Sequence, residues 1–168
     1  ACIGRDRDEL VKGLKEFQIS RQSSPLVYYE GHSVGKASKI TVLFPEAETQ
    51  QNMEVSSVLA TTPFFRRCWN ECEALFEPHI SSRLAEVDFD CAIPLDRAAY
   101  AFCVSYSSFR LLEHWGLQVN SVYGEKEGLY SMAAAVGLLS LESAVVHLIR
   151  RYCSTSCPEF TSYSLTMP

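Results

Sequence analysis

The spacing of apolar residues changes along the chain between helical periods and short continuous runs, and each change marks an expected element. Residues 39–44 (KITVLF) form a continuous apolar run that ends at Pro45, which is typical of a buried parallel strand, and residues 119–123 predict a second short strand. Elsewhere the apolar residues return every three or four positions, as on the buried face of a helix. The expected helices cover residues 49–60, 63–76, 95–115, 129–136 and a segment that begins after Ser140.

Residue types at the element ends agree with these boundaries. Thr62 and Pro63 are the types favoured at the N-cap and at the first position of a helix. Gly116 is the type that ends a helix, here after Trp115. Residues 124–128 then form a turn between the second strand and the following helix. The alternation of strand and helix predicts an α/β fold.

The two ends of the chain differ from its middle. In the first part, Leu10, Val11, Leu14 and Phe17 have helical spacing, and residues 26–29 resemble a strand. The last part is rich in Ser and Thr, so we expect it to be loosely ordered, unless Phe160, Tyr163 and Leu165 fold back over an open core. We therefore divide the chain into a small α/β unit (1–37), a core (38–153) and a tail (154–168).

Composition and charge exclude several classes of function. The 168 residues carry a net charge of −5 with no sustained basic run, so no nucleic-acid partner is indicated. No apolar stretch approaches the roughly 18 residues that span a bilayer. The chain does not begin with Met and its first residues lack a signal core, so we expect a piece of a longer, cytoplasmic polypeptide. No cofactor is indicated.

The seven cysteines raise the question of a metal site. Most lie within apolar helical patterns, which favours buried, reduced thiols. Cys68 with Cys72, and Cys153 with Cys157, are spaced so that they could meet around zinc. Structural zinc sites use tighter spacings, so we expect no metal, but the zinc alternative stays open.

At this point the order of segments resembles a known family. ITVLFPEAETQ (40–50), TTPFFRRCWNECEALFEPHI (61–80), HWGLQVNSVYGEKEG (114–128) and GLLSLESAVVHLIRR (137–151) are similar, in the same order, to the first half of the acyltransferase domain of modular polyketide synthases. Residues 3–17 are similar to the linker that precedes this domain after the ketosynthase. The resemblance implies a truncated acyltransferase: a small α/β linker unit, then a reduced hydrolase-like core with a short parallel sheet and flanking helices.

The departures from the family pattern affect its reacting groups. The family carries its serine nucleophile in GHSxG, on a tight strand–turn–helix elbow. Here the matching residues keep both glycines but replace the His and the Ser with Glu125 and Lys126. A lysine flanked by Glu125 and Glu127 stays protonated near neutral pH, so Lys126 is a poor nucleophile. The matching stretch is Gly124, Glu125, Lys126, Glu127 and Gly128.

The other positions that the resemblance implies are also changed, with one exception. The oxyanion-stabilising glutamine corresponds to Ala47, which has no side-chain donor, and Glu46 and Glu48 add negative charge beside it. The catalytic His would lie in the second half of the domain, which the resemblance does not reach. Arg151 matches the arginine that holds the malonyl carboxylate. We expect Glu127 or Glu125 to take the place of that carboxylate, although a surface arginine is the plainer alternative.

We therefore expect a pseudoenzyme: a non-catalytic element within a polyketide synthase. Its expected partners are the ketosynthase and other domains of the same synthase, a trans-acting acyltransferase or an acyl-carrier protein. It would serve as a docking domain or a passive spacer. The alternative is an enzyme with altered acyl-transfer chemistry that uses Lys126 or a cysteine.

Overall fold

The computed structural model describes residues 6–20, 39–50, 55–89, 92–153 and 163–166. It divides into two compact units, residues 1–38 and 39–168. The first unit contains the helix α1 (Arg7–Ser20), as the spacing of its apolar residues predicted. The Asp6 carboxylate accepts a hydrogen bond from the Glu9 backbone N–H at 2.9 Å, so Asp6 caps this helix. The strand expected at residues 26–29 lies outside the described residues.

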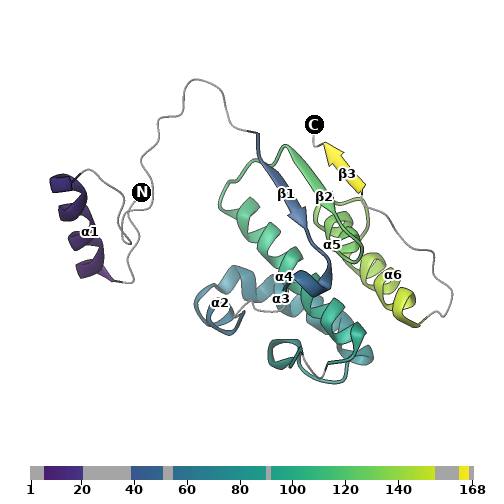
Figure 1. The fold of residues 1–168 in the computed structure, drawn as a ribbon. Helices are drawn as coiled ribbons and strands as arrows, with labels where there is room; N and C mark the ends of the chain where they lie inside the picture. Colours follow the sequence, from purple (N-terminus) through teal and green to yellow (C-terminus); the bar gives the residue numbers. More distant parts are fainter. Residues whose placement is uncertain (1–5, 21–38, 51–54, 90–91, 154–162, 167–168) are drawn as a thin grey trace. The chain divides into compact units, whose positions relative to one another are not determined.

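The second unit is built on a three-stranded sheet with the order β1-β2-β3 (Figure 1). β1 (Thr41–Phe44) and β2 (Ser121–Gly124) are parallel and in register from Thr41 opposite Ser121 to Phe44 opposite Gly124. β3 (Tyr163–Thr166) runs antiparallel to β2 on its other side. The predicted α/β class and the parallel pair are therefore confirmed, and the third strand is an addition.

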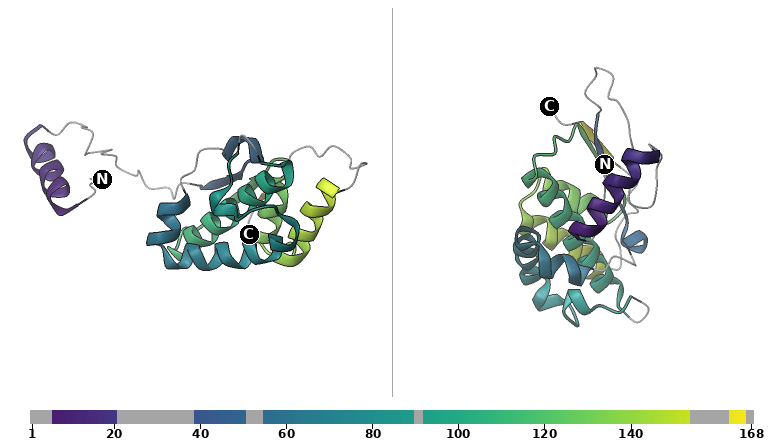
Figure 2. Two further views of the ribbon diagram at one scale, coloured as in Figure 1. Left: turned by 90° about the horizontal axis from the view of Figure 1, so that it is seen from below. Right: turned by 90° about the vertical axis from the view of Figure 1, so that its left-hand side faces the viewer.

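Helices fill the long connection between β1 and β2 and continue after β2. They are α2 (Val55–Thr61), α3 (Pro63–Phe76), α4 (Pro94–His114), α5 (Gly128–Ala135) and α6 (Leu141–Cys153). Short 3₁₀ segments lie at Ala47–Gln50 (η1), Glu77–His79 (η2) and Leu84–Glu86 (η3). α4 packs against both α3 and α5, so the longest helix is the centre of the unit (Figure 2).

Two groups of buried side chains hold this unit together. The larger joins α3, α4 and α6 and includes Trp69, Phe76 and Leu148. The smaller fills the space between the sheet and the helices α4 and α5, where Phe44 packs against Phe109 with ring centroids 5.4 Å apart. Burying side chains of this size stabilises a fold by about 1.5–3 kcal/mol each, so these two groups supply most of the driving force.

Three expectations need correction. β1 is not buried on both faces, since the side chains of Thr41 and Leu43 are exposed. The helix expected at 49–60 is a 3₁₀ turn (η1) and the shorter α2, with residues 51–54 between them outside the described residues. The tail is not loosely ordered throughout, because Tyr163–Thr166 forms β3 by pairing its backbone with β2.

The expected helix ends are partly confirmed. Thr62 occupies the N-cap position of α3 with Pro63 next to it, but the Thr62 side chain makes no capping hydrogen bond. Gly116 follows α4 with a φ of 86°, which glycine adopts at little cost. Ser140 caps α6 through its hydroxyl, which accepts a hydrogen bond from the Ser143 backbone N–H at 3.1 Å. The sequence therefore located these helix ends correctly, even at Thr62, whose side chain forms no capping hydrogen bond.

The start of α5 lies directly on the end of β1. A Cβ atom added at Gly128 would stand 2.2 Å from the Phe44 carbonyl oxygen and 2.5 Å from that of Pro45. Both are backbone atoms, so nothing flexible can move aside. This position therefore admits only glycine without a shift of the whole helix or of β1.

We predict that Gly128→Ala destabilises the chain by at least about 3 kcal/mol, since overpacking against backbone exceeds the usual range for an enlarged side chain. Gly137→Ala is the matched control: Gly137 has a φ of 75° but open space around it, so only the backbone strain of about 1–2 kcal/mol applies. Urea unfolding followed by circular dichroism measures both. Equal losses in the two variants would contradict the role given to the contact with Phe44.

Candidate functional site

The turn between β2 and α5 is a tight elbow, as residues 124–128 predicted. The Glu125 backbone N–H donates to the Phe44 carbonyl at 3.0 Å, and the Gly128 N–H donates to the Glu125 carbonyl at 2.7 Å. Lys126, at the tip, has a φ of 44° and is the one non-glycine residue with a positive φ among those described. A side chain in this left-handed region is held there at a cost, which structures concentrate at functional or formerly functional positions.

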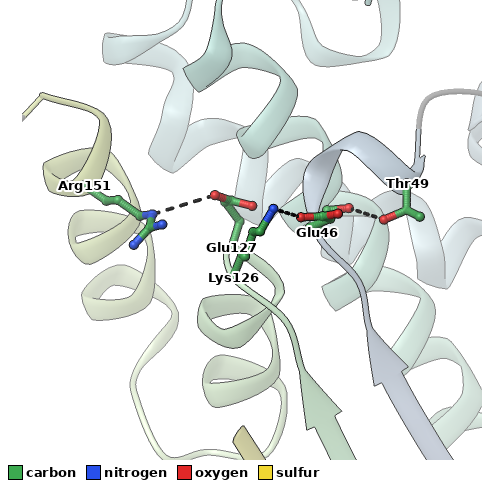
Figure 3. A network of polar contacts seen from close by, with 5 residues as sticks. All are labelled: Glu46, Thr49, Lys126, Glu127 and Arg151. Atoms are coloured by element: carbon green, nitrogen blue, oxygen red, sulfur yellow. Dashed lines mark hydrogen bonds and ion pairs between the residues drawn. The ribbon is translucent and has the colours of Figure 1, made fainter. Parts of the chain in front are cut away.

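The loop after β1 brings a carboxylate to this tip. The Glu46 carboxylate forms an ion pair with the Lys126 ammonium (Figure 3). The backbone carbonyl of Glu46 accepts hydrogen bonds from both the N–H and the hydroxyl of Thr49. The hydrogen bond with Glu46, together with the negative charges of Glu46, Glu48 and Glu127, raises the pKa of Lys126. The ammonium is therefore held in its charged form, which has no lone pair for attack on a carbonyl.

A second ion pair lies on the other side of the elbow. The Nε of Arg151, on α6, stands 3.7 Å from the Oε1 of Glu127 (Figure 3). Both side chains are largely buried, with exposed fractions of 18% and 13%, whereas Lys126 and Glu46 are 55% and 28% exposed. The pair between Glu127 and Arg151 is thus the better shielded from water and from salt.

Tyr152 belongs to the same cluster. Burial raises the pKa of its phenol, and the charge of Glu127 and a hydrogen bond to that carboxylate raise it further. Glu127 therefore has two partners, the Arg151 guanidinium and the Tyr152 hydroxyl. This arrangement fixes the carboxylate inside the fold.

The space left between these groups is small. A cleft of about 90 Å³ lies beside the elbow, lined by Glu46, Ala47, Glu48, Pro94, Arg97, Lys126, Glu127 and Tyr152. Clefts that bind small molecules usually measure about 300–1,000 Å³. The cleft is smaller than this range, and its walls carry charges of both signs.

The structure brings together most of the residues that the sequence singled out. Ala47 and the elbow residues Lys126 and Glu127 line one cleft, and Arg151 approaches it through Glu127. Of the two carboxylates expected to pair with Arg151, Glu127 forms the ion pair described above. Sequence reasoning missed Tyr152, and its position next to Arg151 on α6 was the one available signal.

The histidines and cysteines of the described residues lie elsewhere. The His114 ring stacks on Phe64 with centroids 4.1 Å apart, at the end of α4. Cys68, Cys72 and Cys103 are buried free thiols, and Cys153 is exposed. Within the described ranges no group of three or more His, Cys, Asp or Glu side chains is arranged to hold a metal, while Cys157 lies outside them.

Comparison with known proteins places this site in a family context. No family model matches the chain. The chain is 28% identical over 155 residues to a phenolphthiocerol-synthesis type I polyketide synthase of Mycobacterium marinum, covering 89% of the chain and 7% of that protein. It is 30% identical over 154 residues to the mycoketide-CoA synthase of Mycobacterium tuberculosis, covering 89% of the chain and 4% of the relative.

Solved structures agree with these matches. The acyltransferase domain from the second module of the salinomycin polyketide synthase superposes with a TM-score of 0.74 at 20% identity, covering 89% of this chain and 36% of that one. A loading acyltransferase from the avermectin modular polyketide synthase gives a TM-score of 0.54 at 26% identity, covering 66% and 36%. Sequence and fold thus relate the chain to the acyltransferase portion of modular polyketide synthases, of which it spans about a third.

No helix within the described ranges combines the length and the apolar character needed to span a bilayer.

We predict that Lys126→Gly is more stable than Lys126→Ala, because both variants lose the ion pair with Glu46 but only alanine keeps a Cβ in the left-handed region. The order reverses at Glu71, an exposed position inside α3, where glycine costs about 1 kcal/mol relative to alanine. Urea midpoints of the four variants measure both differences. Alanine being the more stable residue at both positions would contradict the strained elbow.

We predict that Glu127→Gln destabilises the fold by about 1–3 kcal/mol, since it removes the charge of the carboxylate that pairs with the largely buried Arg151. Glu46→Gln is the matched control and has a much smaller effect, because its pair with Lys126 is largely open to solvent. Chemical unfolding at low and at high salt measures both, and the loss in Glu127→Gln is the less salt-dependent. Equal losses in the two variants would contradict the burial of the Arg151 pair.

Proposed function

We propose that this chain is a non-catalytic acyltransferase-like element of a polyketide synthase that serves a structural or docking role. The observation that carries the proposal is that the elbow keeps its backbone shape while its two side chains, Lys126 and Glu127, are each joined in an ion pair. A tip engaged in this way has no group ready to attack a thioester.

Each step of acyl transfer meets a specific obstacle at this site. Attack requires an activated nucleophile, whereas the Lys126 ammonium is kept charged by Glu46. The tetrahedral intermediate requires donors aimed at its oxyanion. Ala47 offers no side-chain donor there, and the carboxylates of Glu46 and Glu48 line the same cleft. Negative charge at that place destabilises an oxyanion instead of stabilising it.

Arg151, at the position that resembles the malonyl-binding arginine, is also engaged in an ion pair. Arg151 pairs with Glu127 inside the fold, so the carboxylate of a malonyl substrate would have to displace an intramolecular carboxylate that loses no translational freedom on binding. We interpret Glu127 as the internal replacement for that substrate group. The fold keeps the charge balance of a loaded site without a substrate.

Cysteine chemistry is the alternative, and the thiols of α3 and α4 argue against it. Burial raises the pKa of the Cys68 thiol, and burial with a hydrogen bond to Cys72 raises the pKa of Cys103. The reactive form of cysteine is the thiolate, which these surroundings disfavour. These side chains therefore serve packing.

A docking role is in keeping with the size of the relatives and with the first unit. The chain spans 7% or less of the two curated relatives described above, which are large synthases. On α1 the side chains of Leu10, Val11 and Leu14 lie on one face and are exposed. An amphipathic helix with an exposed apolar stripe is a common docking element. The partners that we propose are the ketosynthase and neighbouring domains, a trans-acting acyltransferase or an acyl-carrier protein.

We predict that the chain forms no covalent adduct with malonyl-CoA or acetyl-CoA, because neither Lys126 nor the buried thiols are in their nucleophilic form. Intact-protein mass spectrometry after incubation measures this, with an active acyltransferase treated in the same way as the positive control. A stoichiometric acyl adduct mapped to Lys126 or to one cysteine would replace the proposal with altered acyl-transfer chemistry.

We predict that removing the internal carboxylate exposes an anion site. Glu127→Ala should bind malonate, measured by calorimetry, while the wild-type chain should not, because only the variant lacks the carboxylate that pairs with the Arg151 guanidinium. Neutral malonamide is the matched ligand control, and Glu127→Ala with Arg151→Ala is the matched protein control. Wild-type binding as tight as that of Glu127→Ala would show that Glu127 does not occupy the carboxylate position.

A further inference from the structure

β1 is the outer strand of the sheet and has a neighbouring strand on one side only among the described residues (Figure 1). The carbonyl of Ile40 accepts hydrogen bonds from Asn120 and Ser121, and that of Phe44 accepts one from Glu125. Backbone groups alternate in direction along a strand. Since Ile40 and Phe44 face β2, the N–H and C=O groups of Thr41 and Leu43 face the open edge.

Between Thr41 and Phe44 this edge carries no charge, proline or bulge, and the short strand is flanked by Lys39 and Pro45. The strand TVLF contains no charged residue and no proline, and its register with β2 is regular from Thr41 to Phe44, without a bulge. Edge strands of soluble proteins are commonly blunted by lysine, proline or a bulge. β1 therefore presents a short, regular row of donors and acceptors between Lys39 and Pro45.

The face of the sheet next to this edge is also open. Phe44 and Val122 turn toward α4 and α5 and are buried, while Leu43 points to the opposite side and is 53% exposed. Parallel strand pairs are normally covered on both faces. The open edge and the open face therefore adjoin at Leu43.

We propose that β1 is a self-association edge, at which a second copy of this chain adds its own β1 in antiparallel orientation. With Val42 opposite Val42 of the second copy, Thr41 lies opposite Leu43 of the other chain. Each such pair exchanges both of its N–H···O bonds, so one register satisfies the outward groups of both copies. The contact is two-fold symmetric and closed, as most protein dimers are.

Charge selects the antiparallel orientation and favours a copy of the same chain. Lys39 precedes β1 and is exposed, and Glu46 follows it and is half-buried. Antiparallel pairing sets Lys39 of each copy beside the Pro45–Glu46 end of the other, so opposite charges meet at both ends of the contact. Parallel pairing would set lysine beside lysine. This proposal goes beyond the non-catalytic role; it shares Glu46 with the site, where Glu46 pairs with Lys126, but its test does not depend on acyl-CoA reactivity.

The test is sedimentation velocity of the full chain over a wide concentration range, with variants at Leu43. The wild-type chain should shift from monomer to dimer as its concentration rises. Leu43→Pro removes only an outward-facing N–H, and Leu43→Lys adds a charge at the edge, so both should remain monomeric. Leu138→Lys is the matched control, since Leu138 is 58% exposed and lies outside the sheet, and it should dimerise like the wild type.

Circular dichroism establishes whether each variant is folded. If Leu43→Pro does not fold, Leu43→Lys alone carries the test. Amide hydrogen exchange supplies the second readout: Thr41 and Leu43 should gain protection as the wild-type concentration rises, but not in Leu43→Lys. A wild-type chain that stays monomeric over the whole range overturns the proposal and leaves the edge to a different polypeptide. Association that both Leu43 variants leave intact overturns it as well, and neither result bears on acyl-CoA reactivity.

Discussion

The contact between the start of α5 and the end of β1 determines how the rest of the site is arranged. Gly128 lies so close to the Phe44 carbonyl that no side chain fits between them, and the Glu125 N–H is bonded to that same carbonyl. The two residues between these points must therefore complete the turn in little space, which sets Lys126 in a left-handed conformation. Once the backbone is fixed in this way, the directions of the Lys126 and Glu127 side chains are set as well.

That backbone arranges a set of charged side chains. Lys126 meets Glu46 from the loop after β1, and Glu127 meets Arg151 and Tyr152 from α6 (Figure 3). The elbow thereby connects elements that are far apart in the sequence. Through these ion pairs the strained turn acts as a clamp between β1, α5 and α6.

The sequence predicted those parts of the fold that depend on local pattern. The apolar run at 39–44, Pro63 at a helix start and Gly116 at a helix end each placed an element correctly, because propensity and packing agree there. The family resemblance also located the tight turn at residues 124–128. The pairing of Glu127 with Arg151 was one of two alternatives that the sequence left open.

What the sequence did not predict depends on contacts between distant segments. β3 forms because the backbone of residues 163–166 pairs with β2, and its Ser- and Thr-rich surroundings give no strand period. The apolar run of β1 indicated burial on both faces. Whether other elements cover a strand depends on distant segments and cannot be predicted from the residues of the strand alone. Tyr152 was missed because a tyrosine in an amphipathic helix is usually interpreted as a packing residue until its neighbours in space are known.

The most direct measurement of the central claim is a crystal structure of the chain grown with a high concentration of malonate. The account predicts that Lys126 keeps its positive φ, that the Arg151 guanidinium lies against the Glu127 carboxylate, and that no malonate occupies the cleft beside the elbow. Malonate bound by Arg151, with Glu127 turned out to solvent, would contradict it and show a carboxylate site still open to substrate.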